Sequence, residues 1–247
     1  MKHALGVASS KDLELVSGVA QARSRLRSEI QESSVEFPAL TWMEREKDFL
    51  LKGIIVLEQG GVPFDEYEIE LQIPHEFPAL EPKLFEVGGR IEKTADRHIN
   101  DDGSACYEVF EYWLATTSTP TVSEFLRTPV VNFFLSQTIF ELSGEWPFRQ
   151  RSHGIQGLFE ATAEALGIEC DADLIANHLR VLRDWPSKGH HDCPCSSGRR
   201  FRDCHRDELK AVHQKIPPEL AKRFVDRIVR SLKTAEKPAQ PEAPIRS

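Results

Sequence analysis

The sequence lacks the features of a membrane-spanning or secreted chain. No run of apolar residues approaches the roughly 20 that are needed to cross a lipid bilayer. The first residues contain no long apolar stretch of the kind that a signal peptide requires, because Lys11 and Asp12 follow soon after the start. We therefore expect a cytoplasmic protein with no membrane partner.

Cysteine is scarce, and its distribution is uneven. The 247 residues contain five cysteines, an odd number that does not suggest a secreted disulfide framework. Cys193, Cys195 and Cys204 lie close together, whereas Cys106 and Cys170 stand alone. This distribution predicts a metal site and a separate thiol.

The composition is that of an ordinary globular protein, with an uneven distribution of charge. Hydrophobic residues make up 40% of the chain, enough for one good core and a smaller appendage. The net charge is −8, but residues 186–235 carry 12 lysines and arginines against 6 acidic residues. An acidic body with a basic tail predicts either two segments with different partners or two solvated surfaces of different composition.

Periodicity predicts an α+β fold, with an antiparallel meander sheet packed by helices. Apolar residues recur at helical spacing over residues 11–30, and residues 49–57 are apolar enough for a strand buried on both faces. Residues 67–73 alternate apolar with polar side chains, and residues 83–87 form a short third strand. Gly60 and Gly61 predict a hairpin loop between the first two strands.

The second half of the sequence is predominantly helical. Thr121 and Glu124 form a capping box at a helix start, and Gly167 is a good helix terminator. Asp171 or Asp173 begins a further helix. The predicted helices are residues 125–142, 155–166 and 174–182 and an amphipathic helix after Pro217. Residues 184–192 resemble a linker, and residues 236–247 are expected to be disordered.

Residues 193–205 contain three thiols and an imidazole at metal-ligand spacing. The four candidates are Cys193, Cys195, Cys204 and His205. Structural zinc sites use four such ligands in a tetrahedron, and binding free energies of about 10–16 kcal/mol would fold so small a module. His190 and His191 are either competing ligands or a solvated pair in the linker.

This segment resembles the SEC-C motif, whose pattern is Cys-Pro-Cys-Gly-Ser-Gly, then basic and aromatic residues, then Cys-Cys or Cys-His. Ser196 replaces the first glycine. The resemblance implies a structural Zn2+ ion whose four positions are all filled by protein. The basic surroundings predict a docking module for an acidic partner or for nucleic acid.

Two segments around Cys106 carry a second resemblance. Residues 73–85 contain a proline-spaced turn and strand, and residues 97–106 place His98, Asn100 and Gly103 before Cys106. Together with Trp113 and the helix start at Thr121, they resemble the ubiquitin-conjugating enzymes, in which His-Pro-Asn and a glycine turn precede the catalytic cysteine. Ile99 stands in place of that proline, and Tyr107 follows the cysteine where a leucine is usual.

The residue types fit this chemistry. A thiol holds an acyl group well as a thioester, so Cys106 is the candidate nucleophile, expected at the surface on a bent loop; the alternative is a buried small hydrophobe. Asn100 is a candidate to stabilise an oxyanion, typically worth about 2.7–4 kcal/mol, or to shape the loop. His98 is more plausibly a structural residue than a general base. Cys170 is expected to be inert.

The resemblance covers residues 12–167 and implies a ubiquitin-conjugating-like (UBC) domain over residues 1–168. A helix and linker (169–192), an SEC-C-like zinc module with a helix (193–235) and the tail (236–247) would follow. The combined features resemble the bacterial relatives of this family that are found in antiphage (CBASS-type) operons. For them the resemblance implies ligation of the C-terminus of a cyclic-nucleotide synthase or of a ubiquitin-like protein to target amines.

The sequence shows no glycine-rich loop that would cradle the phosphates of ATP. The acyl group must therefore be activated upstream, so the expected partners are the conjugated protein, an activating enzyme and the acceptor proteins. Two alternatives remain: a non-catalytic UBC-fold binding module with a zinc-stabilised docking tail, and a zinc protein associated with nucleic acid. Nucleic acid is the less favoured partner.

Overall fold

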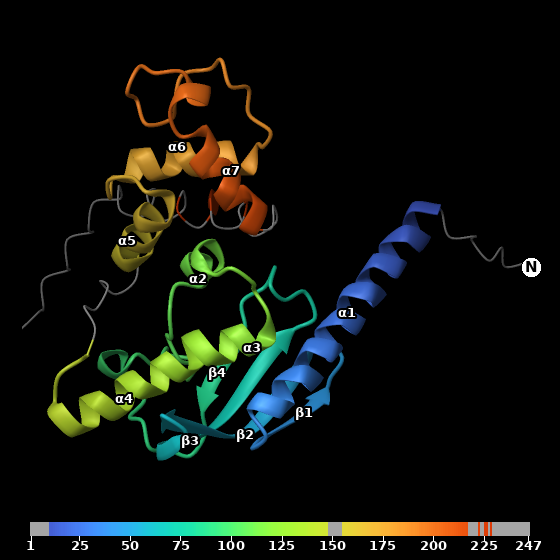
Figure 1. Ribbon diagram of the computed structural model, residues 1–247, viewed down its shortest axis with the longest axis vertical. Helices are drawn as coiled ribbons and strands as arrows, with labels where there is room; N and C mark the ends of the chain where they lie inside the picture. The colour runs from blue at the N-terminus through green and yellow to red at the C-terminus, as the bar shows by residue number, and fades with distance from the viewer. Residues whose placement is uncertain (1–9, 148–154, 217–221, 223–224, 227, 229–247) are drawn as a thin grey trace, which may run out of the picture. The chain divides into compact units, whose positions relative to one another are not determined.

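A four-stranded antiparallel sheet is built from strands that follow one another along the chain (Figure 1). The computed structural model describes residues 10–147, 155–216, 222, 225–226 and 228. The strands are β1 (Leu40–Glu44), β2 (Asp48–Gln59), β3 (Val62–Pro74) and β4 (Lys83–Glu86), in the order β1-β2-β3-β4. The predicted α+β class and antiparallel meander are confirmed.

The helices precede and follow the sheet in the chain. They are α1 (Ser10–Glu36), α2 (Phe110–Thr116), α3 (Val122–Phe125), α4 (Val131–Ser143), α5 (Ile155–Leu166), α6 (Ala172–Arg183) and α7 (Arg206–Lys215). A π-helical turn, Leu126–Val130, joins α3 to α4 and contains Pro129. Because proline lacks an amide hydrogen, this wider turn fits where a regular α-helical bond is lost. The helix predicted at residues 125–142 is therefore present but irregular near its start.

Two predictions fall wholly or partly outside the described residues. Of the helix predicted after Pro217, residues 222, 225–226 and 228 are described, and they are helical. The tail at residues 236–247 lies outside the described part of the chain.

No helix in the described part combines the length and the hydrophobicity that a membrane span requires.

The chain divides into two units, each of which is described by itself. Unit 1 comprises Met1–Glu108 and Ser118–Arg149, and unit 2 comprises Val109–Thr117 and Gln150–Ser247. Helices α2 and α5, which the sequence placed in a domain of residues 1–168, thus belong to the unit that contains the cysteine cluster. The chain enters unit 2 at Val109, returns to unit 1 at Ser118 and then leaves it again.

One face of the sheet is buried in unit 1. Along β3, alternate residues from Tyr67 to Ile73 are buried, as the alternation predicted. Along β2, buried residues also alternate with more exposed ones, and Lys52 and Ile54 are exposed. The expectation that β2 is buried on both faces is wrong, because its apolar run includes side chains on the outer face. Gly60 and Gly61 form the predicted hairpin loop with φ of +62° and +78°, which glycine adopts without strain.

Helix α4 packs on the buried face of the sheet. Phe134 stacks on Tyr67 with ring centres 4.6 Å apart, and the Tyr67 hydroxyl hydrogen-bonds Thr138 Oγ1 at 3.0 Å. Helix α1 packs against β1 and α3 (Figure 1), and its Leu26 and Ile30 are completely buried. These contacts fix α4, which in turn anchors the loop before Cys106.

Unit 2 has its own apolar core. Its buried side chains include Leu158, Ile175, Leu179, Leu182, Cys193, Phe201 and Leu209. The Asp171 carboxylate caps α6 by accepting the Leu174 amide at 2.9 Å, which identifies the start of that helix.

The segment at residues 184–192, which was expected to be a linker, is packed against the cysteine-containing segment. The Trp185 ring stacks on His213 with centres 5.2 Å apart. The Arg202 amide donates a hydrogen bond to the Gly189 carbonyl at 3.0 Å. Residues 184–192 are thus an ordered part of the cysteine-containing module.

Candidate active-site loop and candidate metal centre

Cys106 lies at the end of a short two-stranded ribbon that begins at His98. The Cys106 amide donates to the His98 carbonyl at 2.8 Å, and the Asn100 amide donates to the Ser104 carbonyl at 2.8 Å. Gly103 has a φ of +81°, a conformation that glycine allows at the turn of the ribbon. The predicted glycine turn before the cysteine is confirmed.

The ribbon has a buried side and an exposed side. Ile99 and Ala105 pair with each other and are only 6% and 5% exposed, whereas Asn100 and Cys106 are exposed. Asn100 pairs with Ser104, two residues before Cys106, so Asn100 and Cys106 are diagonal neighbours. Such neighbours in an antiparallel pair are about 7–8 Å apart. Cys106 is therefore at the surface, as expected, and not a buried hydrophobe.

The Asn100 side chain takes part in the structure of its own loop. Its Nδ2 donates to Ser104 Oγ at 3.1 Å, and the Ser104 hydroxyl donates to Asp102 at 2.5 Å. Lys83 donates to the other Asp102 oxygen at 2.7 Å, and these bonds from Lys83 and Ser104 hold the pKa of Asp102 well below its usual range. A side-chain amide has two N–H groups, and the bond with Ser104 uses one of them.

His98 has the backbone geometry of a structural residue. Its φ of +53° is left-handed, and its ring lies edge-on against Trp146 with centres 4.8 Å apart. Its carbonyl oxygen accepts the hydrogen bond from the Cys106 amide. This geometry supports the structural role over the role of general base.

A buried glutamine that sequence reasoning missed anchors the residue before His98. Gln137 on α4 is completely buried, and its Nε2 donates to the Arg97 carbonyl at 2.9 Å. The Arg97 guanidinium donates back to Gln137 Oε1 at 2.9 Å and to Glu141 at 2.9 Å. A glutamine one turn after Phe133 and Phe134, on the buried face of this helix, was the available sequence signal.

The environment of Cys106 favours the protonated thiol. Although the side chain reaches the surface, the atoms packed around it desolvate the sulfur. This burial, together with the negative charge of Glu81, raises the pKa of Cys106. The following residue is firmly held, because the Tyr107 hydroxyl donates to the Pro82 carbonyl at 2.7 Å and its ring meets Phe125 at 5.3 Å.

The four predicted metal ligands are brought together in unit 2. His205 Nδ1 lies 3.3 Å from the sulfurs of Cys193 and Cys204, and the sulfurs of Cys195 and Cys204 are 3.6 Å apart. All four ligand atoms lie within 4.8 Å of one another. A tetrahedral zinc ion would separate two sulfurs by about 3.8 Å and sulfur from nitrogen by about 3.5 Å. The cluster can therefore hold a metal ion of this size.

The backbone around the cluster explains how so short a segment brings four ligands together. The Cys193 amide donates to the Arg199 carbonyl at 2.8 Å, and Ser196 and Gly198 adopt left-handed φ values of +60° and +72°. Phe201, which is 1% exposed, anchors the short 3-10 helix that presents Cys204. His205 is the N-cap residue of α7. His190 and His191 lie outside the group of four and contact each other, with ring centres 4.7 Å apart.

The thiols of the cluster differ in acidity. Burial raises the pKa of Cys193. Burial also opposes ionisation of Cys195, but hydrogen bonds with Ser197 and the neighbouring thiols outweigh it and lower the pKa of Cys195. Metal binding requires deprotonated thiols, so the Cys195 sulfur is better prepared for it than the Cys193 sulfur.

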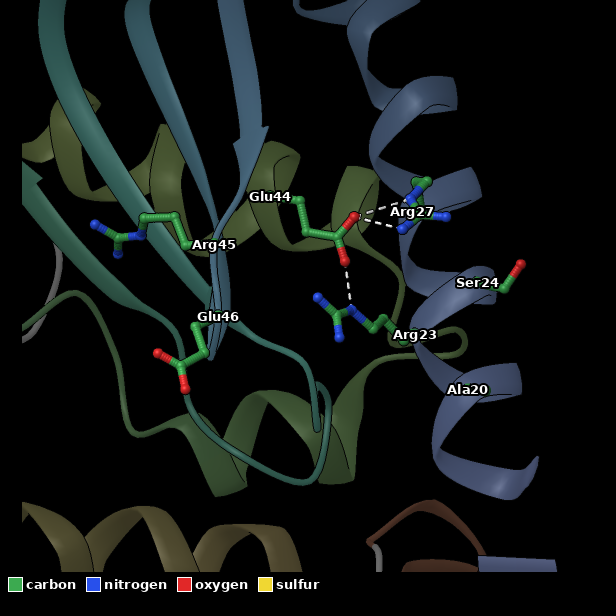
Figure 2. Close-up of a pocket in the computed structure, with 7 residues that line it drawn as sticks. All are labelled: Ala20, Arg23, Ser24, Arg27, Glu44, Arg45 and Glu46. Carbon is green, nitrogen blue, oxygen red and sulfur yellow. Dashed lines mark hydrogen bonds and ion pairs between the residues drawn. The ribbon is translucent and has the colours of Figure 1, made fainter. Parts of the chain in front are cut away.

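An open pocket of about 620 Å³ lies between α1 and β1 (Figure 2). It is lined by Ala20, Arg23, Ser24, Arg27, Glu44, Arg45 and Glu46. Arg23 and Arg27 both pair with Glu44, as Figure 2 shows, and Arg45 pairs with Asp48. With Glu46 counted, the three arginines are balanced by three carboxylates, so the pocket offers little net charge to a ligand. Cys106, Asn100 and His98 do not line it.

Comparisons with known proteins assign no family to the chain. A scan against protein-family models, a search of the curated proteins and a search of the solved structures each found no match. The resemblances to the ubiquitin-conjugating enzymes and to the SEC-C motif stay predictions from the residues that carry them.

Proposed function

We propose that the chain is a ubiquitin-conjugating-like transferase that carries a protein C-terminus as a thioester on Cys106. The observation that supports this most is the exposed thiol on a ribbon that is fastened on two sides. The Ala105 amide donates to the Leu84 carbonyl of β4 at 2.7 Å, and Gln137 of α4 holds Arg97. A nucleophile held in this way meets its reaction partner in a fixed geometry, which is a large part of catalysis.

The reaction has two steps. In the first, the Cys106 sulfur attacks the carbonyl of an acyl group that an upstream enzyme has activated; the sulfur–carbon bond forms, and the activating group and the thiol proton leave. In the second, a target amine attacks the thioester carbonyl. The carbon–nitrogen bond forms, the carbon–sulfur bond breaks, and the Cys106 thiolate takes up a proton released by the amine. The second Asn100 N–H is suited to donate to the oxyanion between these events, typically worth about 2.7–4 kcal/mol.

The conjugated protein in this proposal is a ubiquitin-like protein or a cyclic-nucleotide synthase, and the setting is cytoplasmic antiphage defence. The UBC fold of unit 1 and the SEC-C character of the cysteine cluster belong to the same proposal. Zn2+ would bind to Cys193, Cys195, Cys204 and His205 as a structural ion that stabilises the fold of unit 2. The four protein ligands leave no position for a substrate.

Two observations favour a second candidate, a non-catalytic binding module. The pKa of Cys106 is raised by burial and by Glu81, which leaves less thiolate at neutral pH. Asn100 is also engaged with Ser104 inside its own loop. A loop built for recognition alone would have the same features.

Thioester formation separates the two candidates. The chain is incubated with a peptide thioester that ends in glycine and is analysed by intact mass and on a non-reducing gel. A carrier forms an adduct that thiols remove, and Cys106→Ala abolishes it. Cys170→Ala is the matched control, because Cys170 is also exposed but lacks the ribbon, and it should keep the adduct.

Further variants sharpen the result. Cys106→Ser should give an oxygen ester that withstands thiols and is cleaved by alkali. Equal labelling of Cys106 and Cys170, or no adduct at all, would favour the binding module. Metal analysis of the purified chain checks the zinc proposal separately: about one zinc per chain is expected, and Cys204→Ser should lower it.

A further inference from the structure

His178 is a completely buried histidine beside the candidate metal centre. It lies on α6, where its Nδ1 is 2.7 Å from the Leu174 carbonyl. A carbonyl oxygen only accepts hydrogen bonds, so Nδ1 carries the hydrogen and Nε2 of the neutral ring has a lone pair. This Nε2 is buried and has no hydrogen-bond partner among the described residues. A buried acceptor without a partner is destabilising and calls for an explanation.

His205 has the complementary requirement. Its Nδ1 faces the sulfurs of Cys193 and Cys204, each at 3.3 Å, so Nδ1 is the atom that would bind the metal. The hydrogen of a neutral imidazole ring then resides on Nε2. Histidines that bind a metal almost always donate this second N–H to an acceptor, which fixes the ring orientation and strengthens the ligand.

The two rings already have the separation that such a bond needs. Their centres are 5.3 Å apart, with planes at 88° to each other. Two imidazoles joined end to end by an N–H···N bond of ordinary length have centres about 5.2 Å apart. The ring centres thus have the separation of such a bond, and forming it would require the two rings to reorient, because His178 Nε2 has no partner in the edge-to-face arrangement of the described residues.

We propose that His178 Nε2 accepts a hydrogen bond from His205 Nε2–H when the metal is bound, which makes His178 a positioning residue of the metal centre. This inference rests on the metal binding proposed above. Such a bond would couple the ion to the core of unit 2, to which α6 contributes Ile175 and Leu179. Metal binding would satisfy a buried acceptor on that helix.

A direct test is NMR of the full chain labelled with ¹⁵N and loaded with one equivalent of zinc. We expect a proton on His205 Nε2 and a scalar coupling across the hydrogen bond to His178 Nε2. A zinc-loaded wild-type chain without that coupling would overturn the proposal. This measurement needs no variant, so it decides the question even if a substitution impairs folding.

Zinc affinity, measured by competition with a chromogenic chelator, gives an independent readout. His178→Leu should weaken zinc binding about 10–100-fold, the usual cost of losing an outer partner of a metal ligand. His178→Gln should restore most of the affinity, because its side-chain carbonyl can accept the same bond. The matched control is His213→Leu, since His213 has a buried Nδ1 without a partner in the described residues but stacks on Trp185 instead.

The outcomes separate this inference from the broader proposal. Unchanged affinity in His178→Leu, or an equal loss in His213→Leu, would overturn the role of His178 while leaving the metal site intact. A wild-type chain that binds no zinc would overturn both the metal site and this inference. Thioester formation on Cys106 is measured separately and does not depend on either result.

Discussion

Replacing Gln137 by leucine should release the loop that presents Cys106. Gln137 is completely buried and exchanges two hydrogen bonds of 2.9 Å with Arg97, one to the carbonyl and one from the guanidinium. Leucine fills a similar volume but satisfies neither group. A buried group that loses its partner costs about 1–3 kcal/mol. Arg97 keeps its bond to Glu141, so we expect a total loss of about 2–4 kcal/mol in the free energy of unfolding.

Two assays follow the change. Urea or thermal unfolding should show the loss of stability, with a melting temperature lowered by roughly 5–15 °C. Alkylation by iodoacetamide, with Cys170 as an internal reference, should show faster reaction of Cys106 at neutral pH. The reason is that Arg97 precedes His98, whose carbonyl holds the Cys106 amide, so a looser loop exposes the sulfur and lowers its pKa.

A substitution of the residue next to Gln137 provides the control. Ser136 is half-buried, and its hydroxyl donates within α4 to the Asn132 carbonyl at 2.8 Å. The free energy of unfolding of Ser136→Ala should therefore stay within about 0.5 kcal/mol of the wild-type value, and the alkylation rate of Cys106 should be unchanged. If Gln137→Leu behaves like Ser136→Ala in both assays, α4 does not hold the loop. A loss of stability without faster alkylation would show that the glutamine serves only the core.

The remaining predictions concern charge and metal. Glu81→Gln should lower the pKa of Cys106 and move its alkylation profile to lower pH, because it removes a neighbouring negative charge; an unshifted profile would count against this electrostatic effect. Hydrogen bonds from Arg90 outweigh burial and hold the pKa of Asp65 at about 2. The ionised Asp65 therefore stabilises the folded chain fully above about pH 4, and this stabilisation is lost as the pH falls toward 2. Asp65→Asn should cost about 2 kcal/mol at pH 7 and flatten the acid dependence of urea unfolding; identical slopes for the two proteins would refute this. Removal of metal by a chelator should unfold the cysteine-containing segment of unit 2, because binding of a structural zinc ion contributes about 10–16 kcal/mol at pH 7. Circular dichroism and proteolysis would detect the unfolding. Unaltered spectra after verified metal removal would contradict the prediction.

Sequence reasoning succeeded where a local rule decides the structure. The Thr121 hydroxyl accepts the Glu124 amide at 3.3 Å, and Gly167 ends α5 with a left-handed φ of +66°. The alternation along β3 and the two-glycine hairpin follow from the same kind of short-range pattern. The cysteine cluster belongs here as well, because its four ligands lie within 13 residues and their spacing alone limits the geometry.

The features that were missed depend on partners far away in the chain. Strand β1 has five residues of mixed polarity and exists because Leu40–Glu44 pairs with β2. Along the chain, helix α2 falls between two segments of unit 1, yet it belongs to unit 2. No pattern in its seven residues reveals this assignment. Gln137 and His178 could have been noted as polar residues on apolar helix faces, but their partners, Arg97 and His205, come from other elements.

The raised pKa of Cys106 has opposite consequences for the loading of an acyl carrier and for the survival of the loaded thioester in water. Loading becomes slower, because less thiolate is present to attack. Once formed, however, the thioester is better protected from water, because a thiol of high pKa is a poor leaving group. A partner that places a positive charge against Glu81 would lower the Cys106 pKa during loading and restore it on departure. A carrier benefits from this asymmetry and a pure binding module does not, so Glu81→Gln should both speed loading and shorten the lifetime of the loaded thioester in water.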